Sequence, residues 1–262
     1  MLCRGFVIAA LSVICHAAYA GHLEDVRANK VLRVCIWPEY SSVSYRQPGT
    51  GRVSGVNVDL ARELARDLGV KVMFVESSFA KFPDHLALNR CDLAVSSVGL
   101  ASVRADKLRF IRPHIRGGVC AVVSRENARI KDWGDLDKKG VVVEVTKGSL
   151  AEAVARESVK AASIQAVDGI AELGQDVEAH RADALFVECQ EAQQMQEGSQ
   201  WARQLVAPVG SIPRALSYAW AMVADDNHWY ARIEYFMSEV RRDGRLRTAA
   251  RRYGVEALAV LD

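Results

Sequence analysis

The sequence has few cysteines and no clustered histidines, which excludes several kinds of site. Its six cysteines form no Cys-x-x-Cys pair, and its six histidines are scattered without ligand spacing. A zinc site needs three or four such ligands close together. The chain also has no Gly-x-Ser-x-Gly elbow, no Walker loop and no dinucleotide fingerprint. We therefore expect no metal, no cofactor and no nucleophilic, phosphoryl-transfer or hydride-transfer chemistry.

The sequence also lacks an excess of either positive or negative charge. The 262 residues carry 34 lysines and arginines against 32 aspartates and glutamates, a formal net charge of +2. Nucleic-acid-binding domains and polybasic membrane anchors are far more basic. The arginines of residues 229–253 are therefore interpreted as the solvated face of a C-terminal helix, and no nucleic-acid partner is expected.

Hydrophobic runs are short, and the first of them lies at the N-terminus. Arg4 precedes an apolar stretch over residues 6–15, and a small-x-small pattern ends at Ala20. The bulky residue before Cys15 disfavours the alternative of a lipoprotein anchor. The stretch is shorter than the roughly 20 residues that span a bilayer. We predict export, cleavage after Ala20 and a soluble mature protein of residues 21–262.

Four cysteines remain after cleavage: Cys35, Cys91, Cys120 and Cys189. An oxidising compartment would permit disulfides among them, in any of three pairings or in none. If residues 32–36 and 93–97 form neighbouring strands with level ends, Cys35 and Cys91 lie several residues out of step and too far apart to be bridged. An approach of Cys120 and Cys189 stays open, so the sequence leaves the pairing undecided.

Apolar periodicity in the first half alternates between strands and helices. Leu60, Leu64 and Leu68 lie on one face of a predicted amphipathic helix over residues 58–68, which ends at Gly69. Strands are predicted at 31–37, 70–75 and 93–97, a hairpin at 40–45 and 53–56, and a short helix at 83–89. This alternation favours an α/β fold with a mostly parallel sheet covered on both faces.

The second half repeats this pattern. Strands are predicted at 141–145, 163–167 and 184–187, helices at 150–160 and 170–180, and strand-like connections at 119–123 and 216–223. An Arg-x-Asp phrase precedes an apolar strand in each half, ending at Asp92 and at Asp183. Two similar lobes, with the chain crossing from one to the other and back, are the better interpretation.

The most specific local motif extends from Asp92 to Phe110 and contains small hydroxyl residues and Arg104. It resembles the corresponding stretch of the family 3 extracellular solute-binding proteins, the amino-acid-binding components of ABC importers. The likeness covers nearly all of the mature chain. Matching phrases stand in order at residues 32–34, 55–65, 110–114, 148–149 and 240–246.

The resemblance implies a type II periplasmic-binding fold in which each lobe is a mostly parallel sheet flanked by helices. Lobe 1 would comprise residues 21–117 and 218–262, and lobe 2 residues 118–217. Hinge strands near 116–122 and 212–218 would allow ligand-induced closure. The expected protein is a periplasmic monomer that serves amino acid transport by presenting its ligand to an inner-membrane ABC permease, and it catalyses nothing.

The resemblance also assigns ligand-binding roles. Arg104 would hold a carboxylate with its guanidinium, helped by Ser149, which could equally be a plain helix N-cap. Glu188 stands where the family usually has an aspartate for the ligand's ammonium; the alternative is a strand-end carboxylate that points to water. Ser96 and Ser97 would add acceptors or serve close packing. The aromatic residues Trp37, Tyr40 and Phe79 would enclose the ligand or belong to the core.

Four positions depart from the family's pattern. Trp37 replaces a common aspartate, Gly99 a hydroxyl residue, Leu150 a second hydroxyl residue and Val43 a frequent phenylalanine. The amino-group side of the pocket has thus lost polar groups. The expected ligand is an amino acid or a related carboxylate.

Two further functions remain as alternatives. Cyclohexadienyl dehydratases resemble these binding proteins, and Glu188 could then act as the acid that expels water and carbon dioxide from prephenate or arogenate. A sensory or accessory role in the periplasm without transport is the other alternative.

Overall fold

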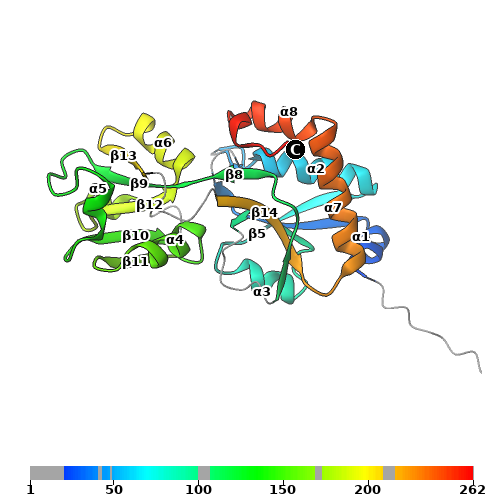
Figure 1. The fold of residues 1–262 in the computed structure, drawn as a ribbon. Helices are drawn as coiled ribbons and strands as arrows, with labels where there is room; N and C mark the ends of the chain where they lie inside the picture. The colour runs from blue at the N-terminus through cyan, green and yellow to red at the C-terminus, as the bar shows by residue number, and fades with distance from the viewer. Residues whose placement is uncertain are drawn as a thin grey trace, which may run out of the picture.

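The computed structural model describes residues 21–40, 43–47, 49–99, 107–168, 173–208 and 216–261, with Tyr40, Ser96 and Ser97 described by their backbone alone. Two lobes lie side by side and are joined where β8 leads into β9 (Figure 1). This is the two-lobed α/β arrangement expected from the sequence. Among the described helices, none is both long enough and apolar enough to cross a membrane.

The lobe at the right of Figure 1 is built on a sheet with the strand order β5-β1-β6-β14-β7, and β8 also pairs with β14. Its parallel part consists of β5 (Lys71–Glu76), β1 (Val31–Ile36) and β6 (Leu93–Gly99). Strand β14 (Leu216–Val223) runs antiparallel to β6, β7 (Leu108–Phe110) and β8 (Ile115–Gly117). The sheet therefore takes strands from both ends of the chain.

Helices cover this sheet as the apolar spacing predicted. Helix α2 (Val56–Leu68) buries Leu60 and Leu64 completely and ends at Gly69, whose φ of +69° suits glycine. The other helices are α1 (His22–Asn29), α3 (Phe82–Ala87), α7 (Asn227–Arg242) and α8 (Arg245–Arg252). The stretch 229–253 is helical as expected, and Gly244, with a φ of +87°, divides it into α7 and α8.

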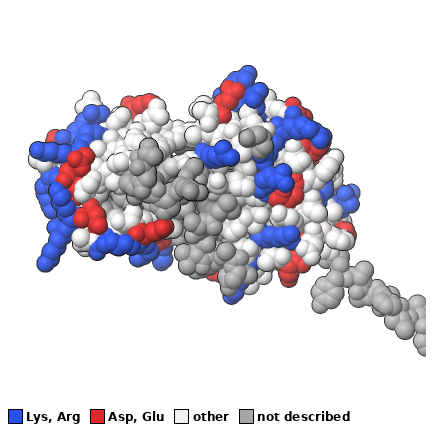
Figure 2. Space-filling view, in the orientation of Figure 1, with Lys and Arg blue, Asp and Glu red and all other residues white. Residues whose placement is uncertain are grey.

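The arginines of this C-terminal region form a solvated face only in part. Arg247, Arg251 and Arg252 are more than half exposed, as predicted, whereas Arg241 is buried and the Arg232 side chain is 17% exposed. Arg251 pairs with Glu256 at 2.9 Å, and Arg252 pairs with Asp59 of α2. Figure 2 shows basic and acidic side chains interspersed on the visible face, in keeping with the small net charge.

The second lobe has the strand order β11-β10-β12-β9-β13. Strands β10 (Val142–Thr146), β11 (Ser163–Val167) and β12 (Ala184–Glu188) are parallel, whereas β9 (Val119–Ser124) runs antiparallel to β12 and β13 (Ala202–Val206). Helices α4 (Leu150–Ser158), α5 (Gln175–Glu178) and α6 (Cys189–Gly198) accompany them. The helix predicted at 170–180 is described only as α5, and α6 and β13 were not predicted.

The repeated Arg-x-Asp phrase has a structural cause. The Asp92 carboxylate accepts a hydrogen bond from the backbone N–H of Arg33 at 2.7 Å, and Asp183 accepts one from Val142 at 2.9 Å. Each aspartate thereby ties the start of its own strand to the neighbouring parallel strand, β1 or β10. The two halves share this phrase because in each sheet the aspartate joins the starts of two neighbouring parallel strands by a hydrogen bond.

Both pairs of mature cysteines are joined by disulfides, Cys35–Cys91 and Cys120–Cys189. The expectation that Cys35 and Cys91 are too far apart was wrong, since their Cα atoms lie 5.6 Å apart. Cys35 is level with Ala94 of β6, and Cys91 stands two residues before β6 begins at Leu93. The chain between Cys91 and β6 therefore does not extend the line of the strand, because an extended segment would hold the two Cα atoms farther apart.

The predicted hairpin is confirmed and lies beside the first sheet as part of β2 (Glu39–Tyr40), β3 (Ser44–Arg46) and β4 (Val53–Ser54). Gly55 follows it with a φ of +134°, and a Cβ there would lie 2.3 Å from the carbonyl oxygen of Val43. Only glycine allows the backbone at position 55 to come so close to Val43. This close contact holds Val43 at the edge of the cavity between the lobes.

Candidate ligand-binding site

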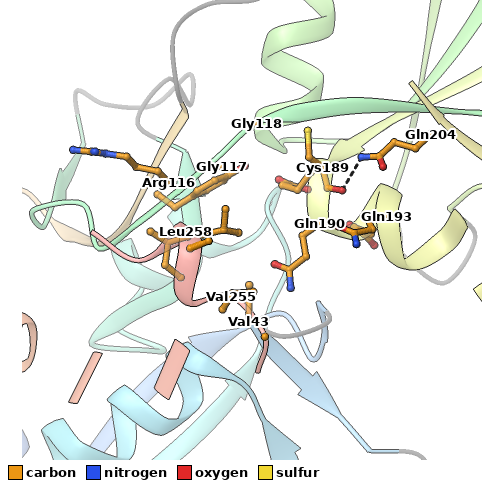
Figure 3. Close-up of a pocket in the computed structure, with 16 residues that line it drawn as sticks. Val43, Arg116, Gly117, Gly118, Cys189, Gln190, Gln193, Gln204, Val255 and Leu258 are labelled. Atoms are coloured by element: carbon orange, nitrogen blue, oxygen red, sulfur yellow. Dashed lines mark hydrogen bonds between the residues drawn. The ribbon is translucent and has the colours of Figure 1, made fainter. Parts of the chain in front are cut away.

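A cavity of about 450 Å³ lies between the lobes beside the chain crossing (Figure 3). Residues of both lobes and of the crossing enclose it. Its lining includes Val43, Ile115, Arg116, Gly117, Gly118 and Tyr218, with Glu188, Cys189, Gln190, Glu191, Gln193 and Gln204 from the second lobe and Gly254, Val255, Ala257 and Leu258 near the C-terminus. This cavity is large enough for an amino-acid-sized ligand.

Glu188 stands where the sequence placed it, at the end of the apolar strand β12 and directly before α6. Its side chain lines the cavity, and one of its carboxylate oxygens is buried. Glu191 follows one helical turn later, so its side chain lies on the same side of the helix. Two carboxyl groups therefore face one cavity.

The environment of Glu191 favours its neutral form. Burial among protein atoms, and secondarily the charge of Glu188, raise the pKa of Glu191 from 4.5 to about 8. Glu191 is then mostly protonated at neutral pH. Glu188 can accept a hydrogen bond or pair with a cation, while Glu191 can donate a hydrogen bond.

Tyr218 of β14 completes this group from the other side of the crossing. Its side chain is 3% exposed, and its hydroxyl has no hydrogen-bond partner within the described part of the chain. Burial, followed by the charges of Glu188 and Glu191, raises the pKa of Tyr218 well above its usual value. The phenol is thus a neutral donor beside the two carboxyl groups.

A second hollow of about 380 Å³ lies at another edge between the lobes, lined by Phe79, Ala80, Phe82, Pro83, Leu108, Lys147, Gly148, Ser149, Glu152, Ala153 and Arg156. Ser149 is 5% exposed, and its hydroxyl accepts a hydrogen bond from the Glu152 N–H at 3.1 Å. It therefore acts as the N-cap of α4 while lying next to Phe79 of the first lobe.

The lobes touch at this hollow. Gly148 has a φ of +75°, and a Cβ there would lie 3.0 Å from the backbone of Phe79 and Ala80. The absence of a side chain at Gly148 thus permits the second lobe to approach the first. Backbone atoms offer no way to relieve a clash at this point.

Trp37 packs inside the first lobe. It is 2% exposed, and its ring lies 5.0 Å from that of Phe79 and 5.4 Å from that of Phe82. These three rings share a buried cluster with the Cys35–Cys91 disulfide. Phe79 also lines the second hollow, whereas Trp37 lines neither of the two hollows.

The remaining predicted residues are placed only in part. Tyr40 belongs to β2, and Ser96 and Ser97 to β6, by their backbone. Arg104 lies outside the described residues. The structure thus brings Glu188 to one hollow and Phe79 and Ser149 to the other.

Glu191, Tyr218 and the glutamines of the cavity were not predicted. The signal for Glu191 was present in the spacing Glu-x-x-Glu at the end of an apolar strand. It depended on a helix at 189–198 that the sequence did not reveal, because this segment has no clear apolar face.

The chain matches the family model of the bacterial extracellular solute-binding proteins, family 3, over residues 32–256. The chain belongs to this family. Members bind solutes outside the cytoplasm, and the two-lobed fold with a cavity at the crossing agrees with such a role. The type II periplasmic-binding fold expected from the sequence is confirmed.

Individual relatives include both binding proteins and an enzyme. The chain is 29% identical to a cyclohexadienyl dehydratase of Pseudomonas aeruginosa over 71% of its length and 70% of the enzyme. It is 28% identical to an L-cystine-binding protein of Escherichia coli over 64% of its length and 62% of that protein, less than two thirds. An ancestral amino-acid-binding protein, described as a precursor of cyclohexadienyl dehydratase, superposes with a TM-score of 0.79 and 25% identity, covering 88% of this chain and 98% of that one.

Substitution of Gly148 tests the contact between the lobes. We expect Gly148→Ala to keep this family member open at the Phe79–Ala80 edge, because the added Cβ meets backbone. Gly140→Ala is the matched control, since Gly140 has a φ of +82° but only the flexible Arg129 side chain nearby, at 3.8 Å. Both changes should lower the free energy of unfolding by about 1–2 kcal/mol. Only Gly148→Ala should enlarge the radius of gyration measured by small-angle scattering; equal radii would refute the contact's role.

The proton on Glu191 should make stability depend on pH. Between pH 4.5 and about 8 the folded chain holds this proton and an unfolded glutamate does not. The stabilising contribution is therefore complete below pH 4.5, declines as the pH rises and is lost above about pH 8, with a slope of at most about 1.4 kcal/mol per pH unit. Urea unfolding of the wild type and Glu191→Gln at pH 5 and pH 8 should show the variant gaining relative stability at pH 8. Parallel pH dependences would contradict the raised pKa.

Proposed function

We propose that this family member captures an amino acid or a related carboxylate in the periplasm, as a monomer cleaved after Ala20, and presents it to an ABC importer permease. The cavity between the lobes carries the proposal. There Glu188 and Glu191 of one lobe face Tyr218 and the crossing. The relatives include an L-cystine-binding protein and an ancestral amino-acid-binding protein, which supports a ligand of this class.

Each group of the cavity has a physical role in this function. Glu188 offers a negative charge to a ligand ammonium, and the neutral Glu191 donates a hydrogen bond to a ligand oxygen. Ser149 and Phe79 approach the ligand from the second hollow, and Arg104 receives its carboxylate as the family pattern implies. No bond of the ligand is broken in this mechanism.

Closure of the two lobes over the ligand is the proposed signal to the permease. Lobe 1 (21–117 and 218–262) receives the ligand, and lobe 2 (118–217) closes over it by rotation about 116–122 and 212–218. The ligand shifts the population toward the closed form because it contacts both lobes only there. The permease would recognise that form.

Ligand-dependent thermal unfolding of residues 21–262 tests the binding function. A ligand present at a hundred times its dissociation constant adds about 2.7 kcal/mol to the free energy of unfolding. We expect such a shift with one class in a panel of amino acids, opines and other carboxylates. Arg104→Ala should abolish it.

The matched control is Arg109→Ala. Arg109 lies 3.4 Å above the ring of Tyr230 and donates to Asn227, and it lines neither of the two hollows. This change should leave the ligand-dependent shift intact. Loss of the shift in both variants would mean that general destabilisation, not a carboxylate contact, is being measured.

A second candidate function is favoured by Glu191. A carboxylic acid that keeps its proton near neutral pH can act as a general acid. It would protonate the departing hydroxyl of prephenate, the C–O bond would break, and the electrons of the breaking C–CO₂ bond would complete the aromatic ring as water and carbon dioxide leave. Glu191 then recovers its proton from water. Glu188, the acid expected from the sequence, is the carboxylate of the pair in this scheme.

Turnover of prephenate separates this function from binding alone. Absorbance of the arylpyruvate product would show turnover by the wild type, and Glu191→Gln should lower kcat at least about 100-fold, as expected for loss of a general acid. Ser158→Ala, remote at the end of α4, is the control. A wild type that binds prephenate without converting it would exclude the enzyme.

A further inference from the structure

The Cys120–Cys189 disulfide forms part of the cavity wall. Cys189 is the first residue of α6 and stands between Glu188 and Glu191 in the helix start. It lines the cavity and is partly exposed, whereas its partner Cys120 in β9 is fully buried. The bond therefore lies directly beside the two carboxyl groups.

The bond ties α6 to the strand that leaves the crossing. Glu188 pairs with Val119 in the sheet, and the Cys189 N–H donates to the Gly118 carbonyl at 2.8 Å. The Cys189 carbonyl accepts from the Gln204 side chain at 3.0 Å, as Figure 3 shows. These hydrogen bonds lie at the edge of the cavity. The disulfide adds a covalent link between the first residue of α6 and β9.

The other disulfide provides a contrast. Cys35 and Cys91 are both fully buried and pack with Phe82 and Leu86 inside the first lobe. Neither cysteine lines the cavity or the second hollow. A small reagent that enters between the lobes reaches the wall at Cys189 without reaching the core of the first lobe.

We propose that the Cys120–Cys189 disulfide positions Glu188 and Glu191 in the cavity and that a dithiol reductant opens it selectively, a role that rests on the ligand site proposed above. Both the positioning role and the selective opening follow from the location of Cys189 in the cavity wall. Ligand affinity then depends on the redox state of this bond.

The reaction is a thiol–disulfide exchange. A thiolate of the reductant attacks the Cys189 sulfur, the bond to Cys120 breaks, and Cys120 leaves as a thiolate that takes up a proton. The second thiolate of the reductant then attacks its own sulfur in the mixed disulfide and releases Cys189. Two electrons pass to the protein, and the reductant departs as a cyclic disulfide. The N-terminus of α6 stabilises the Cys189 thiolate during release.

Opening the bond frees the start of α6 from β9. The carboxyl groups can then move away from Tyr218 and gain water. Glu191 should lose its proton more readily, and the ligand should lose the fixed charge of Glu188.

Alkylation mapping tests the selectivity in the full mature chain. The native protein is treated with dithiothreitol for increasing times, the free thiols are alkylated, and mass spectrometry assigns them. We expect Cys120 and Cys189 to be labelled at least about tenfold faster than Cys35 and Cys91. Equal rates, or faster labelling of Cys35 and Cys91, would overturn selective opening.

Carboxyl titration tests the positioning role without any ligand. In ¹³C NMR spectra, C120S/C189S should move the Glu191 titration from about pH 8 at least one unit toward its ordinary value. The matched control C35A/C91A should lower thermal stability but leave the titration in place. An unchanged titration in C120S/C189S would overturn the proposal, and the reduced wild type serves as a second sample should that variant not fold.

Calorimetry with L-arginine as the probe adds a separate readout. Where the wild type binds L-arginine, C120S/C189S should bind it at least about tenfold more weakly, and equal affinity would count against the positioning role. Failure of L-arginine and the rest of the amino-acid panel to bind the wild type would refute the proposed ligand class. The labelling and titration results would still decide the role of the disulfide.

Discussion

The arrangement of the two lobes depends on one close contact at the crossing, between the ring of Tyr218 and the backbone of Gly117. A Cβ at Gly117 would lie 2.7 Å from the ring, so a side chain there would push the two crossing strands apart. The adjacent Gly118 accepts the hydrogen bond that begins α6. Through this contact the phenol of one sheet reaches Glu188 and Glu191 of the other. Gly117 and Tyr218 thereby line the same cavity as the two carboxyl groups.

The proton on Glu191 gives the cavity its chemical character. Burial raises the pKa of Glu191, and the charge of Glu188 adds to this, so Glu191 keeps its proton near neutral pH. The result is one acceptor and one donor that lie a helical turn apart. Such a pair can recognise a ligand that carries both an ammonium and an oxygen. The proposed dehydratase function would use the same pair to supply a proton to a departing hydroxyl.

Much of the fold could be predicted because its signals are local. Leu60, Leu64 and Leu68 determine the inner face of α2, and the aspartates of the Arg-x-Asp phrases mark the starts of equivalent strands. The path of Cys91 could not be predicted, because it depends on how the chain enters β6 at Leu93. A bend before a strand leaves the apolar periodicity unchanged, so it changes the direction of the chain without a signal in the pattern.

The site was predictable at the ends of strands and not on the face of α6. Glu188 follows an uninterrupted apolar run, and parallel strands present their carboxyl ends at one edge, so its place is visible in the sequence. Glu191 lies in a helix rich in glutamine whose only fully buried residue is Ala192. Such a helix is held by the disulfide and the crossing more than by an apolar face of its own. Its orientation is therefore a property of tertiary structure, and Glu191, whose proton both proposed functions use, becomes recognisable only when both lobes are in place.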